Sequence, residues 1–230
     1  MNTLRRHQLV WLDEYGWYRI LAAASTQPAP APDLQVLACL ELWAERRWPL
    51  VVTRQAVDPA TASPDTPLAL GLAAPSCWGR RALTVTASAR AVVRHGEFAA
   101  AADFGPSLPA TARAGWTRLC EDFARLGVAA RVYGSHGWQR LTGLDYVHAQ
   151  SDIDLQLDVA QPAQADQVCA LLQGAALGAL RIDGELAFND GASVAWREWL
   201  RLRAGETDRV LVKRIASVTL EDARGWMAAA

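Results

Sequence analysis

The sequence is poor in lysine and cysteine and has no long apolar run. Lys213 is its only lysine, and its four cysteines lie far apart without a C-x-x-C pair, which argues against a zinc site or a dense disulfide framework. No apolar run approaches the roughly 18 residues of a membrane span, and charged residues interrupt the N-terminal stretch before signal-peptide length. The net charge of −1 lacks the basic excess typical of nucleic-acid binding. We expect a soluble cytoplasmic protein with no nucleic-acid or membrane partner.

The chain is long enough for one large domain or two modest ones, since it has 230 residues. A stretch rich in Gly, Pro and Ala at residues 104 to 115 marks a break, so we expect domains at 1–108 and 109–230. In the first domain, Asp33 resembles an N-cap because apolar residues recur at helical spacing after it. With strands expected at 48–54 and 83–88, the first domain is predicted to be a small α+β unit.

The second domain alternates helical and extended patterns. A mixed sheet with flanking helices accounts for this order, and the predicted fold class is therefore α+β with two domains. We expect strands at 128–133, 152–159, 180–188 and 209–215 and helices at 116–126, 138–144, 163–177 and 193–202.

A Gly-Ser pair and an Asp-Ile-Asp strand lie close together in the second domain. Gly134 and Ser135 follow an apolar strand, so their backbone N–H groups can point at a phosphate. Asp152 and Asp154 are two apart in an extended strand and project to the same side. Two neighbouring carboxylates repel unless a cation lies between them, and Mg²⁺ prefers such oxygen ligands. Solvated aspartates at a strand end are the alternative; the nearby Gly-Ser pair favours a metal site.

Two further charged positions have competing interpretations. Lys213 lies on an alternating strand and can act as a compact charge for a phosphate. An edge-strand charge that discourages aggregation is an equally good account of it. Arg197 and Glu198 are expected to form an ion pair that fixes a helix against the sheet.

Several segments resemble known families. The second half resembles the nucleotidyltransferase superfold, whose signature is a Gly-Ser turn, an Asp-x-Asp strand and a third acid on a later strand. A more specific resemblance, over nearly the whole chain, is to malonate decarboxylase holo-[acyl-carrier-protein] synthases, also called phosphoribosyl-dephospho-CoA transferases. The segments that carry it are RHQLVWL at 6–12, YGSHGWQRLTGL at 133–144, SDIDL at 151–155, RIDGEL at 181–186 and VAWREW at 194–199.

The resemblance implies a reaction and its partners. The phosphoribosyl-dephospho-CoA group would pass from 2′-(5″-triphosphoribosyl)-3′-dephospho-CoA to a serine of the acyl-carrier subunit of malonate decarboxylase, with release of diphosphate. It also implies roles for particular residues. Asp152 and Asp154 would bind Mg²⁺, and Asp183 would be the third acid, as a metal ligand or as the base for the acceptor serine. Glu185 shares a strand face with Asp183, and either can fill that position.

Two other functions stay open at this stage. The interval between the Gly-Ser pair and the Asp-Ile-Asp strand is longer than in the smallest members of the superfold, so a nucleotidyltransferase that uses ATP is one alternative. A non-catalytic module that binds a nucleotide or a carrier protein is the other. The presence of all three candidate acids favours catalysis.

Overall fold

The computed structural model describes residues 4–26, 33–63 and 65–222 of the chain, and they form two compact units. The N-terminal unit comprises the chain up to Glu97 together with Trp138–Tyr146, and the C-terminal unit comprises Phe98–Gly137 and the chain from Val147 onward. Each unit has its own mixed helix and sheet structure, which confirms the α+β, two-domain expectation.

The division between the units precedes the expected domain boundary at residues 108 and 109. It falls between Glu97 and Phe98. The boundary lies earlier because the residues that follow it form a 3₁₀ helix, η3 (Ala101–Ser107). Phe104 and Leu108 are each 2% exposed and belong to the apolar core of the C-terminal unit, so this segment packs with that unit despite its loop-like composition.

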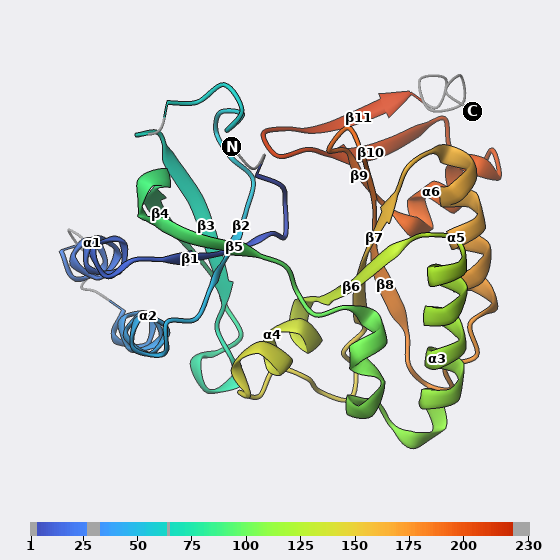
Figure 1. The fold of residues 1–230 in the computed structure, drawn as a ribbon, viewed down its shortest axis with the longest axis horizontal. Coiled ribbons are helices and arrows are strands. Elements are labelled where there is room, and N and C mark those ends of the chain that lie inside the picture. The colour runs from blue at the N-terminus through green and yellow to red at the C-terminus, as the bar shows by residue number, and fades with distance from the viewer. Residues whose placement is uncertain (1–3, 27–32, 64, 223–230) are drawn as a thin grey trace. The chain divides into compact units, whose positions relative to one another are not determined.

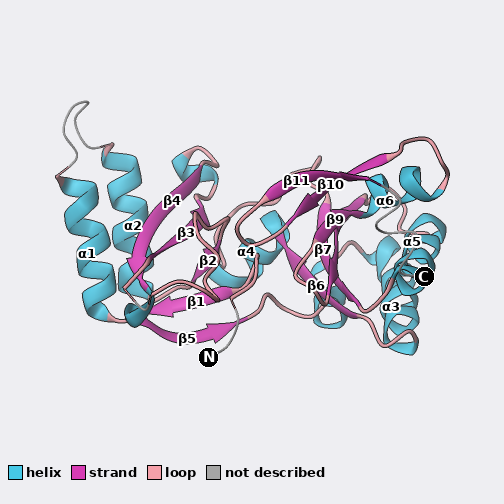
Figure 2. Cartoon of the chain, turned by 90° about the horizontal axis from the view of Figure 1, so that it is seen from above, coloured by secondary structure: helices cyan, strands magenta, loops and turns pink. Residues whose placement is uncertain are grey.

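The N-terminal unit packs two helices on an antiparallel sheet. Asp13 and Asp33 cap the helices, since their side chains accept backbone N–H groups of the first turns. The helices lie side by side on one face of the sheet (Figures 1 and 2). The strand order is β4-β3-β2-β1-β5. The elements are β1 (Leu9–Leu12), α1 (Glu14–Ser25), α2 (Leu34–Arg46), β2 (Leu50–Val52), β3 (Pro67–Ala73), η1 (Ser76–Trp78), β4 (Ala82–Ser88), η2 (Ala89–Ala91) and β5 (Val92–Gly96).

The C-terminal unit is a six-stranded mixed sheet with helices on one face (Figure 1). The strand order is β11-β10-β9-β8-β7-β6, in which only β7 and β8 pair in parallel. A crossover through α5 joins these two strands, as a parallel pair requires. Its elements are α3 (Ala110–Arg125), β6 (Ala129–Tyr133), β7 (Ile153–Val159), α5 (Pro162–Gly174), β8 (Ile182–Phe188), β9 (Ser193–Ala195), α6 (Trp196–Arg203), β10 (Arg209–Lys213) and β11 (Val218–Asp222). Helix α4 (Gly134–Thr142) begins in this unit, and its residues from Trp138 onward belong to the N-terminal unit.

The two faces of this sheet differ in chemistry. Side chains alternate along each strand, so one face is apolar and belongs to the core that α3, α5 and α6 complete. The opposite face carries polar side chains on β6, β7, β8 and β10, and we call it the polar face. Its members are Arg131, Tyr133, Asp154, Gln156, Asp158, Asp183, Glu185 and Lys213.

One predicted helix begins later than expected. Residues 193–195 form strand β9 and the helix starts at Trp196. Ser193 pairs with β8 on one side and with β10 on the other, and these ladder bonds override the helical pattern of the following residues. None of the helices in the described ranges is long and apolar enough to cross a membrane.

Candidate active site

The Gly-Ser pair begins a helix beside a carboxylate. β6 ends at Tyr133, whose register partner on β7 is Asp154, and α4 begins at the next residue. Gly134 has a positive φ of 61°, and a Cβ built there would overlap the Asp154 carboxylate. Glycine is therefore required for the helix to begin this close to the acid. The first backbone N–H groups of α4 have no acceptor within the helix, which leaves them available to an anion.

Asp154 is the central acid of the polar face. It lies opposite Asp183 in the parallel pairing of β7 and β8. Burial raises the pKa of Asp154 to about 6, and repulsion from Asp183, Asp152 and Glu185 contributes further. The structure thus brings the Asp-Ile-Asp acids and both candidates for the third acid into one electrostatic group.

Each of the other three acids has a basic partner of its own, whereas Asp154 makes no ion pair with any described residue. Asp154 is therefore the uncompensated negative charge of the site. The pairs are Arg181 Nε with Asp152 Oδ1 at 2.7 Å, Arg197 Nε with Asp183 Oδ1 at 3.9 Å, and Lys213 Nζ with Glu185 Oε1 at 2.5 Å.

The carboxylates are not preorganised as a metal-binding site. In the part of the chain that the structure describes, no group of three or more His, Cys, Asp or Glu side chains is arranged to hold a metal ion. Asp152 instead faces Arg181, which explains why the expected trio of Asp152, Asp154 and Asp183 is close but not assembled.

The two candidates for the third acid are distinguished by their surroundings. Half of the Asp183 side chain is exposed, and its register partner is Asp154. Only 7% of the Glu185 side chain is exposed, and its carboxylate accepts from Lys213. Asp183 is the acid that an incoming group can reach.

Two arginines beside the acids were missed by sequence reasoning. Arg181 holds Asp152, and Arg197 lies near Asp183 while donating through Nη2 to the carbonyl of Ile182 at 2.8 Å. The expected pair of Arg197 with Glu198 was wrong. Glu198 instead accepts the backbone N–H of Leu211 at 3.1 Å and so ties α6 to β10. The position of Arg181 two residues before Asp183 was the available signal.

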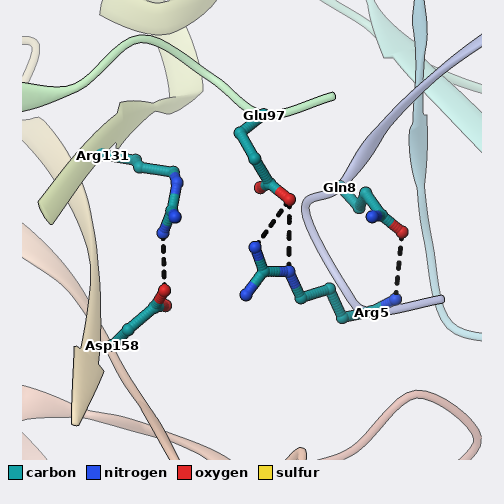
Figure 3. Close-up of polar contacts among 5 residues, drawn as sticks. All are labelled: Arg5, Gln8, Glu97, Arg131 and Asp158. Atoms are coloured by element: carbon teal, nitrogen blue, oxygen red, sulfur yellow. Dashed lines mark hydrogen bonds and ion pairs between the residues drawn. The ribbon is translucent and has the colours of Figure 1, made fainter. Parts of the chain in front are cut away.

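Ion pairs also stabilise regions away from the acids. Figure 3 shows Arg131 on β6 donating to Asp158 on β7 at 2.7 Å, toward the far end of the polar face from Asp154. The same figure shows Arg5 of the N-terminal unit bound to Glu97 through Nη2 at 2.6 Å. Arg5 immediately precedes the RHQLVWL segment and ties the start of the N-terminal unit to its end, which is a structural role.

Known families match both units of the chain. The model described as "Phosphoribosyl-dephospho-CoA transferase MdcG N-terminal domain" matches residues 5–98, and the corresponding C-terminal domain model matches residues 98–224. The two models meet at the position where the structure divides. No solved structure is significantly similar to the chain.

Relatives named phosphoribosyl-dephospho-CoA transferase align along most of the chain. The protein from Bradyrhizobium diazoefficiens strain USDA 110 is 33% identical over 98% of this chain and 93% of its own length. The protein from Xanthomonas campestris pv. campestris strain 8004 is 34% identical over 91% of this chain and 90% of its own length. Since both domain models and these relatives match nearly end to end, the chain is an enzyme of the phosphoribosyl-dephospho-CoA transferase family.

Proposed function

We propose that this enzyme transfers the phosphoribosyl-dephospho-CoA group from 2′-(5″-triphosphoribosyl)-3′-dephospho-CoA to a serine of the acyl-carrier subunit of malonate decarboxylase in the cytoplasm. The serine hydroxyl oxygen attacks the phosphorus atom nearest the ribose. A phosphodiester bond forms, the bond to the next phosphate breaks, diphosphate leaves, and the hydroxyl proton passes to a base.

The single observation that carries this proposal is the setting of Asp154. Its carboxylate lies against the first residue of α4, where free N–H groups can bind phosphate, and it lacks a basic partner within the described ranges. A negatively charged triphosphate can approach such an acid only if a cation neutralises the repulsion. The site thus combines donors for phosphate with a charge that requires a cation.

The donor set fits Mg²⁺. Carboxylate oxygens are the ligands that this ion prefers, and Mg²⁺ commonly uses one or two carboxylates together with substrate phosphates. Asp154 and Asp183 would hold it, and Asp152 would join once it leaves Arg181. When bound, Mg²⁺ neutralises charge on the phosphates and on the leaving diphosphate.

The chain's own residues supply positioning. The N–H groups of Gly134 and Ser135, with the Ser135 hydroxyl, would hold the outer phosphates, and Lys213 would add a point charge. Asp183 is exposed enough to accept the proton of the acceptor serine. Phosphoryl-group transfer needs little covalent chemistry from the protein, so fixed donors and in-line alignment supply most of the rate.

Mass spectrometry of the acceptor tests this function. The enzyme, Mg²⁺, the triphosphoribosyl dephospho-CoA and the apo acyl-carrier subunit are incubated, and the carrier is expected to gain the mass of the transferred group.

Asp154→Asn should abolish the gain and keep the fold, because it removes repulsion among the acids. Asp208→Asn, at an exposed position of the same unit, is the matched control and should retain transfer. A wild-type reaction that leaves the carrier mass unchanged rejects the proposed function.

A second candidate, a transferase that uses ATP, shares the acids and the α4 N-terminus. The same assay separates the two. Replacing the CoA-derived donor with ATP should give no mass gain on the carrier, and a carrier that gains an AMP mass would favour the second candidate.

A further inference from the structure

The only lysine of the chain reaches a buried acid on the polar face. Lys213 is the last residue of β10, and its Nζ donates to Glu185 Oε1 at 2.5 Å. The Lys213 side chain is 30% exposed, whereas that of Glu185 is 7% exposed. The pair therefore consists of an enclosed carboxylate and an ammonium group that a ligand can reach.

This ion pair spans an intervening strand. β9 lies between β8 and β10, with Ala195 opposite Glu185 and Ser193 opposite Lys213. Neighbouring strands are about 4.8 Å apart, so about 10 Å separates the two backbones. Two long side chains are needed to cover that distance, and the single methyl group of Ala195 leaves the path across β9 open. Because the carboxylate fixes the far end of this reach, the lysine side chain is held in one direction.

The choice of lysine is itself informative. Among the lysine and arginine residues of the chain, all except Lys213 are arginines. An ammonium group is compact and binds a phosphate as a point charge, whereas guanidinium is planar and needs a wider approach. The negative charge of Glu185 also repels that of Asp154 and raises the pKa of Asp154. A pair with only a structural role could be replaced by apolar residues without that disadvantage.

We propose that Glu185 is a positioning residue that holds the ammonium group of Lys213 on the polar face, where it contacts the phosphate chain of the donor. This inference rests on the proposed function and deepens it. Glu185 acts through Lys213 and touches neither the acceptor serine nor the reacting phosphorus atom. Asp183 is then the third acid, and the two acids of the IDGEL segment have separate tasks.

Chemical labelling of a single side chain tests the ammonium group. Because Lys213 is the only lysine, an acetylating reagent modifies one side-chain amine, and peptide mass spectrometry separates it from the N-terminal amine. Inorganic diphosphate with Mg²⁺ is the probe. Saturating diphosphate should slow acetylation of wild-type Lys213 at least about tenfold, as a charge-assisted contact implies.

A variant and its matched control test the positioning role. Glu185→Gln should speed acetylation of Lys213 without diphosphate and raise the half-protecting diphosphate concentration about tenfold. Glu221→Gln breaks another partly buried ion pair of the same sheet, with Arg214, and should behave as wild type. In transfer assays Glu185→Gln should raise KM for the donor more than it lowers kcat. A structural role alone would affect both variants through stability and would leave the protection by diphosphate unchanged.

The outcomes separate this inference from the proposed function. A wild-type enzyme that modifies the carrier but shows no protection of Lys213, or a Glu185→Gln variant that matches wild type, overturns the inference alone. A wild-type enzyme that never modifies the carrier overturns both. Should Glu185→Gln fail to fold, Lys213→Arg keeps the charge of the pair and should weaken diphosphate binding about tenfold by calorimetry. Unchanged binding in that variant would also overturn the inference.

Discussion

At the scale of single residues, Gly134 shows how backbone conformation and site geometry depend on each other. Its positive φ costs a non-glycine residue about 1–2 kcal/mol, and any Cβ also overlaps Asp154. We therefore expect Gly134→Ala to lower the free energy of unfolding by more than about 2 kcal/mol and to abolish transfer. Urea unfolding and the carrier-mass assay measure the two effects.

Gly143 provides the control for that substitution. Its φ of 74° carries the same backbone penalty, but a Cβ there would meet nothing within 4 Å. Gly143→Ala should cost about 1–2 kcal/mol and leave transfer intact. Equal losses of stability and activity in the two variants would contradict a steric role for Gly134.

His136 should make stability depend on pH. It packs edge-on against Phe104, with ring centroids 5.9 Å apart, and burial lowers its pKa below the ordinary 6.5. The unfolded chain then binds more protons than the folded one below about pH 6.5, so this contribution is full above that pH and is lost as the pH falls toward the folded-state pKa. His136→Gln should reduce the loss of unfolding free energy between about pH 7.5 and about pH 5.5.

A control variant and a contradicting outcome complete this prediction. His95→Gln, at an exposed position on β5, is the matched control for replacing a histidine outside the core. If His136→Gln retains the full wild-type pH dependence, burial of this imidazole has no part in it.

At the scale of elements, one carboxylate joins the helices that support the site. Asp166 on α5 accepts the indole N–H of Trp199 at 2.8 Å and pairs with Arg203 at 2.6 Å, both on α6. Trp199 is fully buried. Asp166→Ala leaves that N–H without its acceptor and should cost about 2–3 kcal/mol in thermal or urea unfolding.

Asp122 offers the comparison for this prediction. It pairs with Arg125 within α3, where the arginine is largely exposed, so Asp122→Ala should cost less than about 1 kcal/mol. A loss for Asp166→Ala no larger than that for Asp122→Ala would show that the join between α5 and α6 does not depend on this carboxylate.

At the scale of the whole molecule, the N-terminal unit depends on a segment that follows it in the chain. Residues 138–146 belong to that unit. Trp138 is 5% exposed and meets Trp43 edge-on, with centroids 6.2 Å apart, while the Tyr146 hydroxyl donates to the carbonyl of Ala73 at 2.8 Å. The unit is therefore discontinuous in sequence, although the family models meet at a single position.

A fragment of residues 5–97 should consequently be unstable. Loss of a buried tryptophan alone costs about 3–5 kcal/mol, which is a large part of the stability of a small domain. The same fragment joined to residues 138–146 through a Gly-Ser linker should recover a cooperative melt by circular dichroism. Equal melting temperatures for the two fragments would contradict this dependence.

Local patterns in the sequence determined the types of elements and the order of motifs. Alternation and helical spacing depend on near neighbours, so the strands 152–159 and 209–215 and the helix after Asp33 were close to the observed β7, β10 and α2. β1, β3, β5 and β11 were not predicted, since short strands are defined mainly by the partners they pair with. The Gly-Ser and Asp-Ile-Asp motifs are also local, and their spacing predicts a phosphate site.

Only the tertiary structure decided how the charges are shared. The sequence shows four acids and many arginines, but strand register places Asp183 opposite Asp154 and directs Lys213 across β9 to Glu185. It also assigns Arg181 to Asp152 and leaves Asp154 without a basic partner among the residues described. These pairings join residues far apart in the chain, and their energies depend on distance and burial, which no local pattern of residues contains.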